Sequence, residues 1–536
     1  MNAELFDNNY SIYNNINISD NFSHSGEIYT HLSNTYGTFA PDGEIRRRQW
    51  LNKNQEDGDE SDPYWKNPLL TFASYTKTEK GGGSWIVHYS NIANYCIKRF
   101  AVLNVRDRCF IYDNNEGIYR ENNRDIESTI KLGLDACGYA KSKPIGPIVT
   151  DVMKRIMDTN RCSEDPFNRR SDLIPCNNGA YNIRTKQLEP YSPLHGFTYK
   201  YPTNYNPDAD IRPILDYIRG LVKEEDLRLI LQMLSSVVMR DHHKRLYLIY
   251  NLSGNNGKST FLNLIEATIG GKNVSHLSPQ AITNGPFNSA ELDGKVANIA
   301  SDIEDKAIYD TAIIKQLTGN DPIHAQRKYG QPYNFVFRGV CVWGCNTPPR
   351  INDDTDAFNR RVVLIEFPNQ FAQDSTFADE FLSDSMNHEA LLKIAIDHVP
   401  YLLESGVIDT DVEATRYELK MKSDPVFAFI EERMERDERY VFADPDPDTS
   451  EIHDSSINLE YIHSQYIDYC REAKVKRTLG INAFKKALGN YSRYSVHVKY
   501  KGSSGNQTAI VKGARLRTRT VDVTNAPLDK FVACPQ

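Results

Sequence analysis

A strand, a loop and a helix near residue 254 constrain the fold more than any other feature of the chain. Residues 246–250 are apolar and β-prone, and the chain from Phe261 onward has the apolar spacing of a helix. The loop between them has glycine, lysine and hydroxyl residues at the spacing of a phosphate-binding loop. Its members are Gly254, Asn255, Asn256, Gly257, Lys258, Ser259 and Thr260. This order predicts an α/β domain in which a buried strand leads directly to a bound nucleotide; a solvated loop is the alternative.

Each residue type in this loop suits the binding of a nucleotide phosphate. Glycine lets backbone N–H groups converge on phosphate, Lys258 would neutralise the outer phosphates, and Ser259 would offer its hydroxyl to Mg²⁺ at a helix N-terminus. ATP and Mg²⁺ are therefore the expected ligands. Leu252 stands where the full motif has its first glycine, so the opening turn must form without the freedom in φ that glycine has. This departure weakens the prediction of fast hydrolysis more than the prediction of binding.

Two later strands end in polar residues that suit nucleotide chemistry. Residues 295–300 are strand-like, and Asp302 and Glu304 follow them. An ATPase needs one acid to hold Mg²⁺, which we assign to Asp302, and another to orient water, which we assign to Glu304. The strand-like run 339–344 leads to Asn346, whose amide can hold the attacking water or contact the γ-phosphate. A turn-forming asparagine is the alternative interpretation.

A pair of arginines, Arg360 and Arg361, precedes a further strand-like segment. Arginines in this position can reach the γ-phosphate of a neighbouring subunit, where they raise the rate of hydrolysis by several powers of ten. Surface salt bridges are the alternative interpretation of the pair.

Composition and charge set the class of protein. The chain has 536 residues, of which 40% are hydrophobic and 25% charged, as in globular proteins of two to four domains. No apolar run approaches the roughly 18 residues of a membrane span, and the polar start is unlike a signal peptide. We therefore expect an intracellular protein without a membrane partner. Nine cysteines without paired Cys-x-x-Cys spacing argue against a disulfide framework and a zinc ribbon.

Basic residues are concentrated near the end of the chain. Residues 471–520 contain thirteen lysines and arginines and one acid, so this segment carries +12 although the whole chain carries −8. The remaining residues therefore carry −20. A compact basic segment on an acidic protein is typical of a nucleic-acid-binding appendage. A solvated basic face is the alternative.

Taken in order, these motifs resemble the superfamily 3 helicases, in particular the primase-helicases of phages, plasmids and poxviruses. The resemblance covers roughly residues 90 to 400. Within the core it rests on residues 256–260, 300–304, 317–323, 327–329, 346–349 and 358–361. Upstream, residues 178–182 and 205–209 are similar to the module that precedes the helicase core in this family.

The resemblance implies a homo-oligomeric ring, a hexamer of AAA+ type cores, which hydrolyses ATP between subunits and threads single-stranded DNA. In that family a hairpin before the third strand carries basic residues into the central channel. The best matches here are Arg327 and Lys328, with Lys315 and His324 as second choices. Between the two arginines, Arg361 is slightly favoured as the residue that reaches the neighbour.

The family often joins this core to a primase, and here the sequence differs. The acid-rich string at 441–448 contains prolines that would break a central strand, so we interpret it as a linker. We expect no primer synthesis by this chain, and a separate primase or polymerase as a partner.

The C-terminal region has the pattern of a winged helix. Helix-like stretches at 457–473 and 480–488 precede a β-wing at 495–511. This places Lys485 and Lys486 on the recognition helix and Lys499 and Lys501 at the wing, where they would dock on duplex DNA.

The fold class expected is thus α/β, a P-loop AAA+ type helicase core with an N-terminal α/β module and a C-terminal winged-helix-like domain. The expected regions are a polar, partly disordered segment (1–84), the α/β module (85–211), the core with its leading helices (212–400), a helical segment and acidic linker (401–454), the basic domain (455–520) and a tail (521–536).

Three classes of function fit this organisation. The leading one is an ATP-dependent replicative DNA helicase of a virus, phage or plasmid. The second is an ATP-dependent DNA-binding initiator or loader with little unwinding activity. The third, a P-loop kinase of small molecules, is disfavoured by the chain length, the paired arginines and the basic C-terminal segment.

Overall fold

The computed structural model describes most of the chain from residue 69 to residue 516. The described residues are 69, 72–77, 82–141, 143–159, 161–162, 165–251, 254–303, 308, 311–351, 353, 355–372, 375–407, 411–436, 457–473, 475, 478–490, 497–503, 506–512 and 514–516. Leu252, Glu304 and the string at 441–448 lie outside them. Among the described residues, no helix combines the length and the apolar character that crossing a bilayer requires.

A five-stranded parallel sheet forms the centre of the molecule. Its strands, in spatial order, are β10 (Val274–Ser275), β11 (Ala297–Ala300), β14 (Val340–Cys345), β9 (Leu246–Tyr250) and β15 (Val362–Glu366). Helices cover both faces, so β9 and β14 are buried along their whole length and consist of continuous apolar runs. Because all five strands are parallel, their carboxyl ends share one edge of the sheet.

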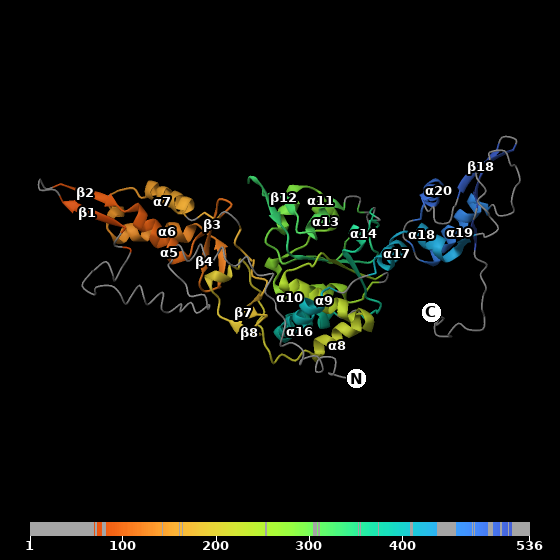
Figure 1. The fold of residues 1–536 in the computed structure, drawn as a ribbon, viewed down its shortest axis with the longest axis horizontal. Helices are drawn as coiled ribbons and strands as arrows, with labels where there is room; N and C mark the ends of the chain where they lie inside the picture. The colour runs from red at the N-terminus through yellow and green to blue at the C-terminus, as the bar shows by residue number, and fades with distance from the viewer. Residues whose placement is uncertain are drawn as a thin grey trace.

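One face of the sheet is covered by long helices (Figure 1). They are α8 (Arg212–Leu221), α9 (Leu227–Met239), α10 (Lys258–Ile269) and α16 (Ser385–Ser405), with α15 (Ser375–Ser383) beside them. The apolar stripe of α9, which includes Ile230, Leu234 and Val238, is buried. Helix α16 runs past residue 400, the expected end of the core, to Ser405 and buries Leu402 after that point.

Shorter elements cover the other face (Figure 1). They are α11 (Pro279–Thr283), α12 (Pro286–Ser289), α13 (Ala312–Leu317), α14 (Asp356–Asn359) and the antiparallel hairpin of β12 (Pro322–Gln326) and β13 (Pro332–Val336). The two faces divide β9 by alternation, since Tyr247 and Ile249 belong to one core cluster and Leu248 and Tyr250 to the other.

The N-terminal region is a separate α/β assembly at one end of the molecule (Figure 1). Its helices are α5 (Tyr89–Phe100), α6 (Arg124–Ala136) and α7 (Gly146–Thr159). Its sheets are β1 (Ala73–Lys77) with β2 (Gly83–Val87), and β3 (Leu103–Val105) with β4 (Arg108–Asp113) and β5 (Ile118–Glu121). A further sheet of β6 (Leu173–Cys176), β7 (Gly179–Asn182) and β8 (Gln187–Glu189) joins the central core through Ile174 and Tyr181.

The expected boundary at residue 84 falls within β2. Strand β1 pairs with β2 from Ala73 opposite Val87 to Lys77 opposite Gly83. Phe72 is fully buried, and a Cβ on Gly133 of α6 would lie 2.1 Å from its ring. This short hairpin is held by contacts of Phe72 with Gly133 and of Trp85 with Tyr139, which local composition does not reveal.

The C-terminal region packs α18 (Pro425–Arg433), α19 (Leu459–Glu472), α20 (Ile481–Asn490) and a hairpin around one core, with α17 (Val412–Ser423) beside it. The strands of this region are β16 (Met434–Arg436), β17 (Ile457–Asn458), β18 (His497–Ser503), β19 (Asn506–Lys512) and β20 (Ala514–Leu516). Phe429, Tyr466 and Phe484 are fully buried at the centre of this core. Tyr461, on α19, is exposed.

Candidate active site

The loop after β9 has the backbone shape that its glycine and asparagine allow. Asn255 and Gly257 both lie in the left-handed region, with φ of 57° and 77°. A Cβ on Gly257 would lie 2.7 Å from Cδ2 of Leu221, so this position requires glycine for space as well as for conformation. A Cβ on Gly254 would meet nothing within 4 Å, which leaves the front of the loop open.

Lys258 begins α10 and is nearly enclosed, with 6% of its surface exposed. Its Nζ donates to Oδ1 of Asn256 at 3.0 Å and to Oδ1 of Asn346 at 3.3 Å. Burial lowers the pKa of Lys258, while Cys345 and Asp302 act in the opposite direction. Both hydrogen-bond acceptors are neutral amides, and among the described side chains no carboxylate forms an ion pair with Lys258. The site thus holds a partly desolvated cation ready for an anion.

The strand order brings Asn346 and Asp302 to the same edge as Lys258. Strand β14 lies between β9 and β11, so Asn346, directly after β14, stands between the other two. The N–H of Ile303 donates to the carbonyl of Gly344 at 2.9 Å, which holds the segment after β11 against the end of β14. Lys258, Asn346 and Asp302 therefore come together at the carboxyl edge, where open α/β sheets bind ligands.

The donor set at this edge fits Mg²⁺ better than a metal held by protein alone. Among the described residues, no group of three or more His, Cys, Asp or Glu side chains could hold a metal ion. Asp302 and Ser259, the latter exposed in the first turn of α10, offer one carboxylate and one hydroxyl. Mg²⁺ in nucleotide sites uses one or two protein oxygens and completes its shell with phosphates and water.

The arginine pair lies at the opposite edge of the sheet. The N–H of Leu246, at the start of β9, donates to the carbonyl of Arg361 at 2.7 Å. The length of β9, about 13 Å at 3.3 Å per residue, therefore separates the pair from the loop of the same chain. The structure does not bring Arg360 or Arg361 to Lys258.

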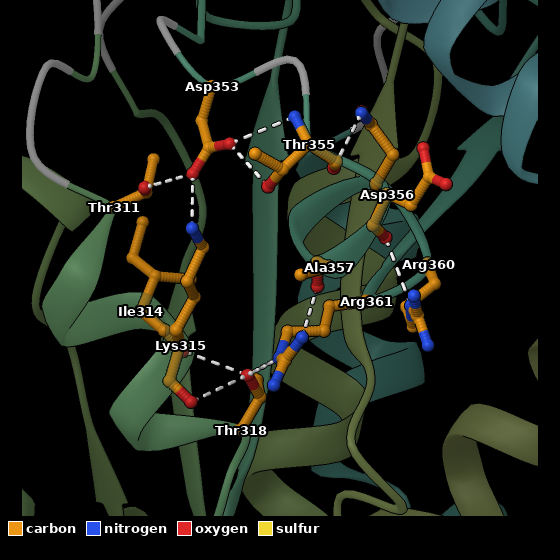
Figure 2. A network of polar contacts seen from close by, with 11 residues as sticks. Thr311, Ile314, Lys315, Thr318, Asp353, Thr355, Asp356, Ala357, Arg360 and Arg361 are labelled. Carbon is orange, nitrogen blue, oxygen red and sulfur yellow. Dashed lines mark hydrogen bonds and ion pairs between the residues drawn. The ribbon is translucent and has the colours of Figure 1, made fainter.

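The two arginine side chains are held differently (Figure 2). Nε of Arg361 donates to Oγ1 of Thr318 at 3.0 Å, and its guanidinium also donates to the carbonyl of Ala357. Arg360 is exposed, and its Nε donates to the carbonyl of Asp356 at 3.1 Å. Arg361 thus supports the fold of its own chain, whereas Arg360 presents the rest of its guanidinium outward.

Asp353 holds the loop that leads to the arginines, a role the sequence did not suggest (Figure 2). It pairs with Nζ of Lys315 at 2.6 Å and accepts hydrogen bonds from Thr311 and Thr355. Burial alone would raise the pKa of Asp353, but these bonds outweigh it and hold the pKa well below its usual range. Lys315, a second choice for DNA contact, is therefore engaged within the fold.

The hairpin of β12 and β13 ends in exposed cationic and aromatic side chains. Tyr329, at its tip, is 95% exposed, and Nζ of Lys328 lies 5.4 Å from the centre of its ring. Arg327 pairs with Asp293 at 3.6 Å, and His324 is exposed on β12. The exposed tyrosine was not among the predicted DNA contacts, although its position beside Arg327 and Lys328 between two strand-like runs is a usable signal.

The basic C-terminal residues are described in part. On α20, Lys486 is exposed and Lys485 is half-buried. Lys499 and Lys501 lie in β18, which pairs with β19, but their side chains are outside the described part of the chain.

Comparison with known proteins finds two family regions in this chain. Residues 88–237 match a family described as D5 N terminal like, and residues 250–361 match a family of unknown function, DUF5906. A D5 N terminal like region followed by a DUF5906 region is the primase-helicase architecture, and this chain has it. The resemblance seen in the sequence motifs is confirmed.

Individual relatives are distant. A protein of Acanthamoeba polyphaga mimivirus described as "Putative helicase" is 26% identical over 184 residues, which are 33% of this chain and 19% of that protein. The chain thus spans about a fifth of the length of this curated relative. Among solved structures, the NrS-1 C-terminal region is 10% identical with a TM-score of 0.37 and covers 79% of this chain and 98% of its own. A JCV helicase structure is 14% identical with a TM-score of 0.23 over 40% of this chain and 63% of its own.

Proposed function

We propose that this chain is an ATP-dependent DNA helicase of a virus, phage or plasmid, which works as a hexameric ring on single-stranded DNA. The observation that carries the proposal is the convergence of Lys258, Asn346 and Asp302 at the carboxyl edge of the parallel sheet. The primase-helicase architecture and the mimivirus relative described as "Putative helicase" support it.

The loop from Gly254 to Thr260 supports ATP as the ligand. The N-terminus of α10 would direct backbone N–H groups toward the phosphates, and Lys258 supplies a cation whose two hydrogen-bond acceptors are neutral amides. Ser259 and Asp302 would hold Mg²⁺, which when bound neutralises charge on the transferred phosphate. Asn346, which contacts Lys258, is placed to bind the γ-phosphate or the attacking water. Glu304 remains the acid proposed to orient that water.

The position of the arginines supports action between subunits. Arg360 and Arg361 lie at the amino edge of the sheet, far from the loop of their own chain, so a phosphate contact requires a second copy. An AAA+ type ring supplies such a neighbour. Since Arg361 is bound to Thr318, we propose Arg360 as the arginine that reaches the neighbouring nucleotide, which reverses the slight preference taken from the sequence.

DNA contacts are proposed at two places. The hairpin tip, with Arg327, Lys328 and Tyr329, offers cations and an exposed ring, the combination that holds single strands without reading sequence. The C-terminal helices and hairpin, with Lys486 exposed on α20, support a winged-helix-like domain that docks on duplex DNA.

One set of assays tests the proposal. We expect purified protein to hydrolyse ATP, to do so faster with single-stranded DNA, and to displace a strand from a forked duplex. Lys258→Ala should abolish all three activities, whereas Lys131→Ala, an exposed lysine on α6, should keep them. Hydrolysis that is indifferent to DNA, together with no strand displacement, would contradict a helicase.

The second candidate is an ATP-dependent DNA-binding initiator or loader with little unwinding activity. Leu252, in place of the first glycine of the loop, and the basic C-terminal segment favour it. The same assays separate the two, because a loader would assemble on DNA with ATP and leave the forked duplex intact.

A further inference from the structure

A cleft of about 680 Å³ lies at the amino edge of the central sheet, away from the candidate active site. One wall comes from the N-terminal region, from β3, β4, β5 and residues 165–169. The other comes from the turns that precede β9, β10, β11 and β14. Because these strands are parallel, their carboxyl ends and Lys258 lie at the opposite edge.

The lining of this cleft is strongly cationic. Nine of its side chains are arginine or lysine, and three are aspartate or glutamate. The sequence does not predict this excess of positive charge, because the chain outside residues 471–520 has a net charge of −20. The basic residues are scattered along the chain from Arg106 to Arg338, and only the fold gathers them.

The three acids are already paired. The pairs are Arg108 with Glu121, whose Nε and Oε2 are 2.9 Å apart, Arg106 with Asp165 at 3.2 Å, and Arg327 with Asp293 at 3.6 Å. Each of the three carboxylates therefore has an arginine partner, although Asp165 and the nearby Asp241 also act electrostatically on Arg338, on the wall formed by the sheet edge.

Two cations on the wall formed by the sheet edge, Arg240 and Lys295, donate hydrogen bonds to neutral backbone carbonyls. Nε of Arg240 donates to the backbone carbonyl of Lys295 at 3.1 Å, and its guanidinium lies 5.5 Å from the ring centre of Tyr199. Nζ of Lys295 donates to the backbone carbonyl of Lys272 at 2.6 Å. Carbonyl oxygens orient these groups but do not cancel their charge.

Like charges also act on one another across the cleft. The pKa of Arg338 is lowered by loss of solvent and then by the positive charges of Arg240 and Arg169. Loss of solvent lowers the pKa of Lys295 as well. An anion in the cleft would relieve this repulsion, and phosphate suits it because guanidinium groups bind phosphate oxygens in a fixed fork.

The aromatic residues of the cleft argue for contact with a backbone and not with bases. The rings of Phe110 and Phe167 are 4.6 Å apart, and those of Tyr119 and Phe167 are 5.3 Å apart, so they pack on one another and not on a base.

The volume of the cleft is in the range of about 300–1,000 Å³ found for ligand clefts, which is too small for a duplex. Arg327 joins the cleft to the hairpin tip.

We propose that this cleft binds the phosphate backbone of single-stranded DNA, beside the strand held by the hairpin. The choice of DNA rests on the proposed function, whereas the preference for phosphate rests on the cleft itself. The phosphates of a free nucleotide have the same chemistry, so the test includes both.

The test uses the full chain and a fluorescent dT oligonucleotide. The double variant Arg240→Ala, Arg338→Ala should bind it about tenfold more weakly, and the slope of log affinity against log salt should fall by about 0.7 for each phosphate that the variant no longer neutralises. Arg240→Lys, Arg338→Lys, which keeps both charges but loses the guanidinium forks, should keep the wild-type salt slope and bind more tightly than the double alanine variant. The matched control, Lys131→Ala with Arg212→Ala, removes two exposed cations from α6 and α8 and should bind as the wild type does.

The same variants are also made in a Lys485→Ala, Lys486→Ala background. This background removes the contribution of α20 to oligonucleotide affinity, so that the contribution of the cleft is measured alone. Unchanged oligonucleotide affinity in a folded Arg240→Ala, Arg338→Ala protein would overturn the inference. So would a loss of ATP affinity alone, which would make the cleft a nucleotide site.

If the variants do not fold, chemical labelling of the native protein tests whether the cleft binds DNA. Lys272, exposed at the cleft, should be protected from amine acetylation by bound dT oligonucleotide, while Lys131 should not. Equal labelling of Lys272 with and without saturating DNA would contradict the inference. If the wild type bound DNA through the cleft but neither hydrolysed ATP nor unwound DNA, the proposed function would fail and this inference would stand.

Discussion

Nζ of Lys258 lies 3.3 Å from Oδ1 of Asn346, which joins the loop after β9 to the end of β14. We predict that Asn346→Ala lowers kcat for ATP hydrolysis by about 10²-fold and changes ATP affinity little, because the amide acts on the reacting phosphate. Asn346→Asp should weaken ATP binding, since a carboxylate would pair with Lys258 and repel phosphate. Steady-state kinetics and nucleotide titration measure both. Asn115→Ala, on an exposed turn, is the control.

We predict that Arg360 acts in catalysis and that Arg361 acts in the stability of the fold. Arg360→Ala should reduce kcat by about 10³-fold or more and leave the thermal midpoint unchanged, because its side chain is exposed. Arg361→Ala should lower the midpoint, because it removes the bond to Thr318. Mixing Lys258→Ala and Arg360→Ala subunits should restore activity at about one interface in four if the site is shared between copies. Mixtures that remain inactive would contradict a shared site.

The exposed ring at the hairpin tip predicts a stacking contact. Tyr329→Ala should weaken binding of single-stranded DNA by about 1–3 kcal/mol, while Tyr329→Phe and Tyr329→Trp keep the ring and should retain affinity. Fluorescence anisotropy at fixed salt measures this. If Tyr329→Phe weakened binding as much as Tyr329→Ala, the hydroxyl and not the ring would make the contact.

A buried histidine predicts a pH dependence of stability. Burial and then Arg228 lower the pKa of His398 from 6.5 to about 4. As the pH falls, His398 is therefore protonated in the unfolded chain before it is protonated in the folded protein. The stability that neutral His398 contributes is complete above about pH 6.5 and is lost progressively between about 6.5 and 4. The difference corresponds to about 3 kcal/mol of unfolding free energy. His398→Gln should flatten the dependence in urea unfolding, whereas the exposed His324→Gln should not.

The C-terminal helix α20 predicts a salt-dependent contact with duplex DNA. Lys486→Glu should weaken duplex binding and reduce the slope of log affinity against log salt by about 0.9 for each phosphate that it leaves without a cation. Lys131→Glu, an equal change of charge on α6, is the control. A Lys486→Glu protein with the wild-type slope would show that duplex DNA binds elsewhere.

Local order along the chain made part of the fold predictable. The strand at 246–250 and the helix after Lys258 are contiguous, and their apolar spacing is enough to identify them. The helices and hairpin of the C-terminal region lie close to their predicted positions for the same reason. The boundaries at residues 84 and 400 could not be predicted, because the contact of Phe72 with Gly133 and the continuation of α16 depend on packing between distant segments.

By itself, the sequence determined the loop chemistry at Gly257 and Lys258, the motif order and the basic C-terminal segment, because each of these features depends on residues that are close together in the chain. Only the tertiary structure placed β14 between β9 and β11, so that Asn346 meets Lys258, and put Arg360 at the opposite edge. It also gathered the cations of the cleft from an acidic part of the chain. The physical reason is that strand pairing and parallel direction, which set these neighbours, leave no trace in local periodicity or composition.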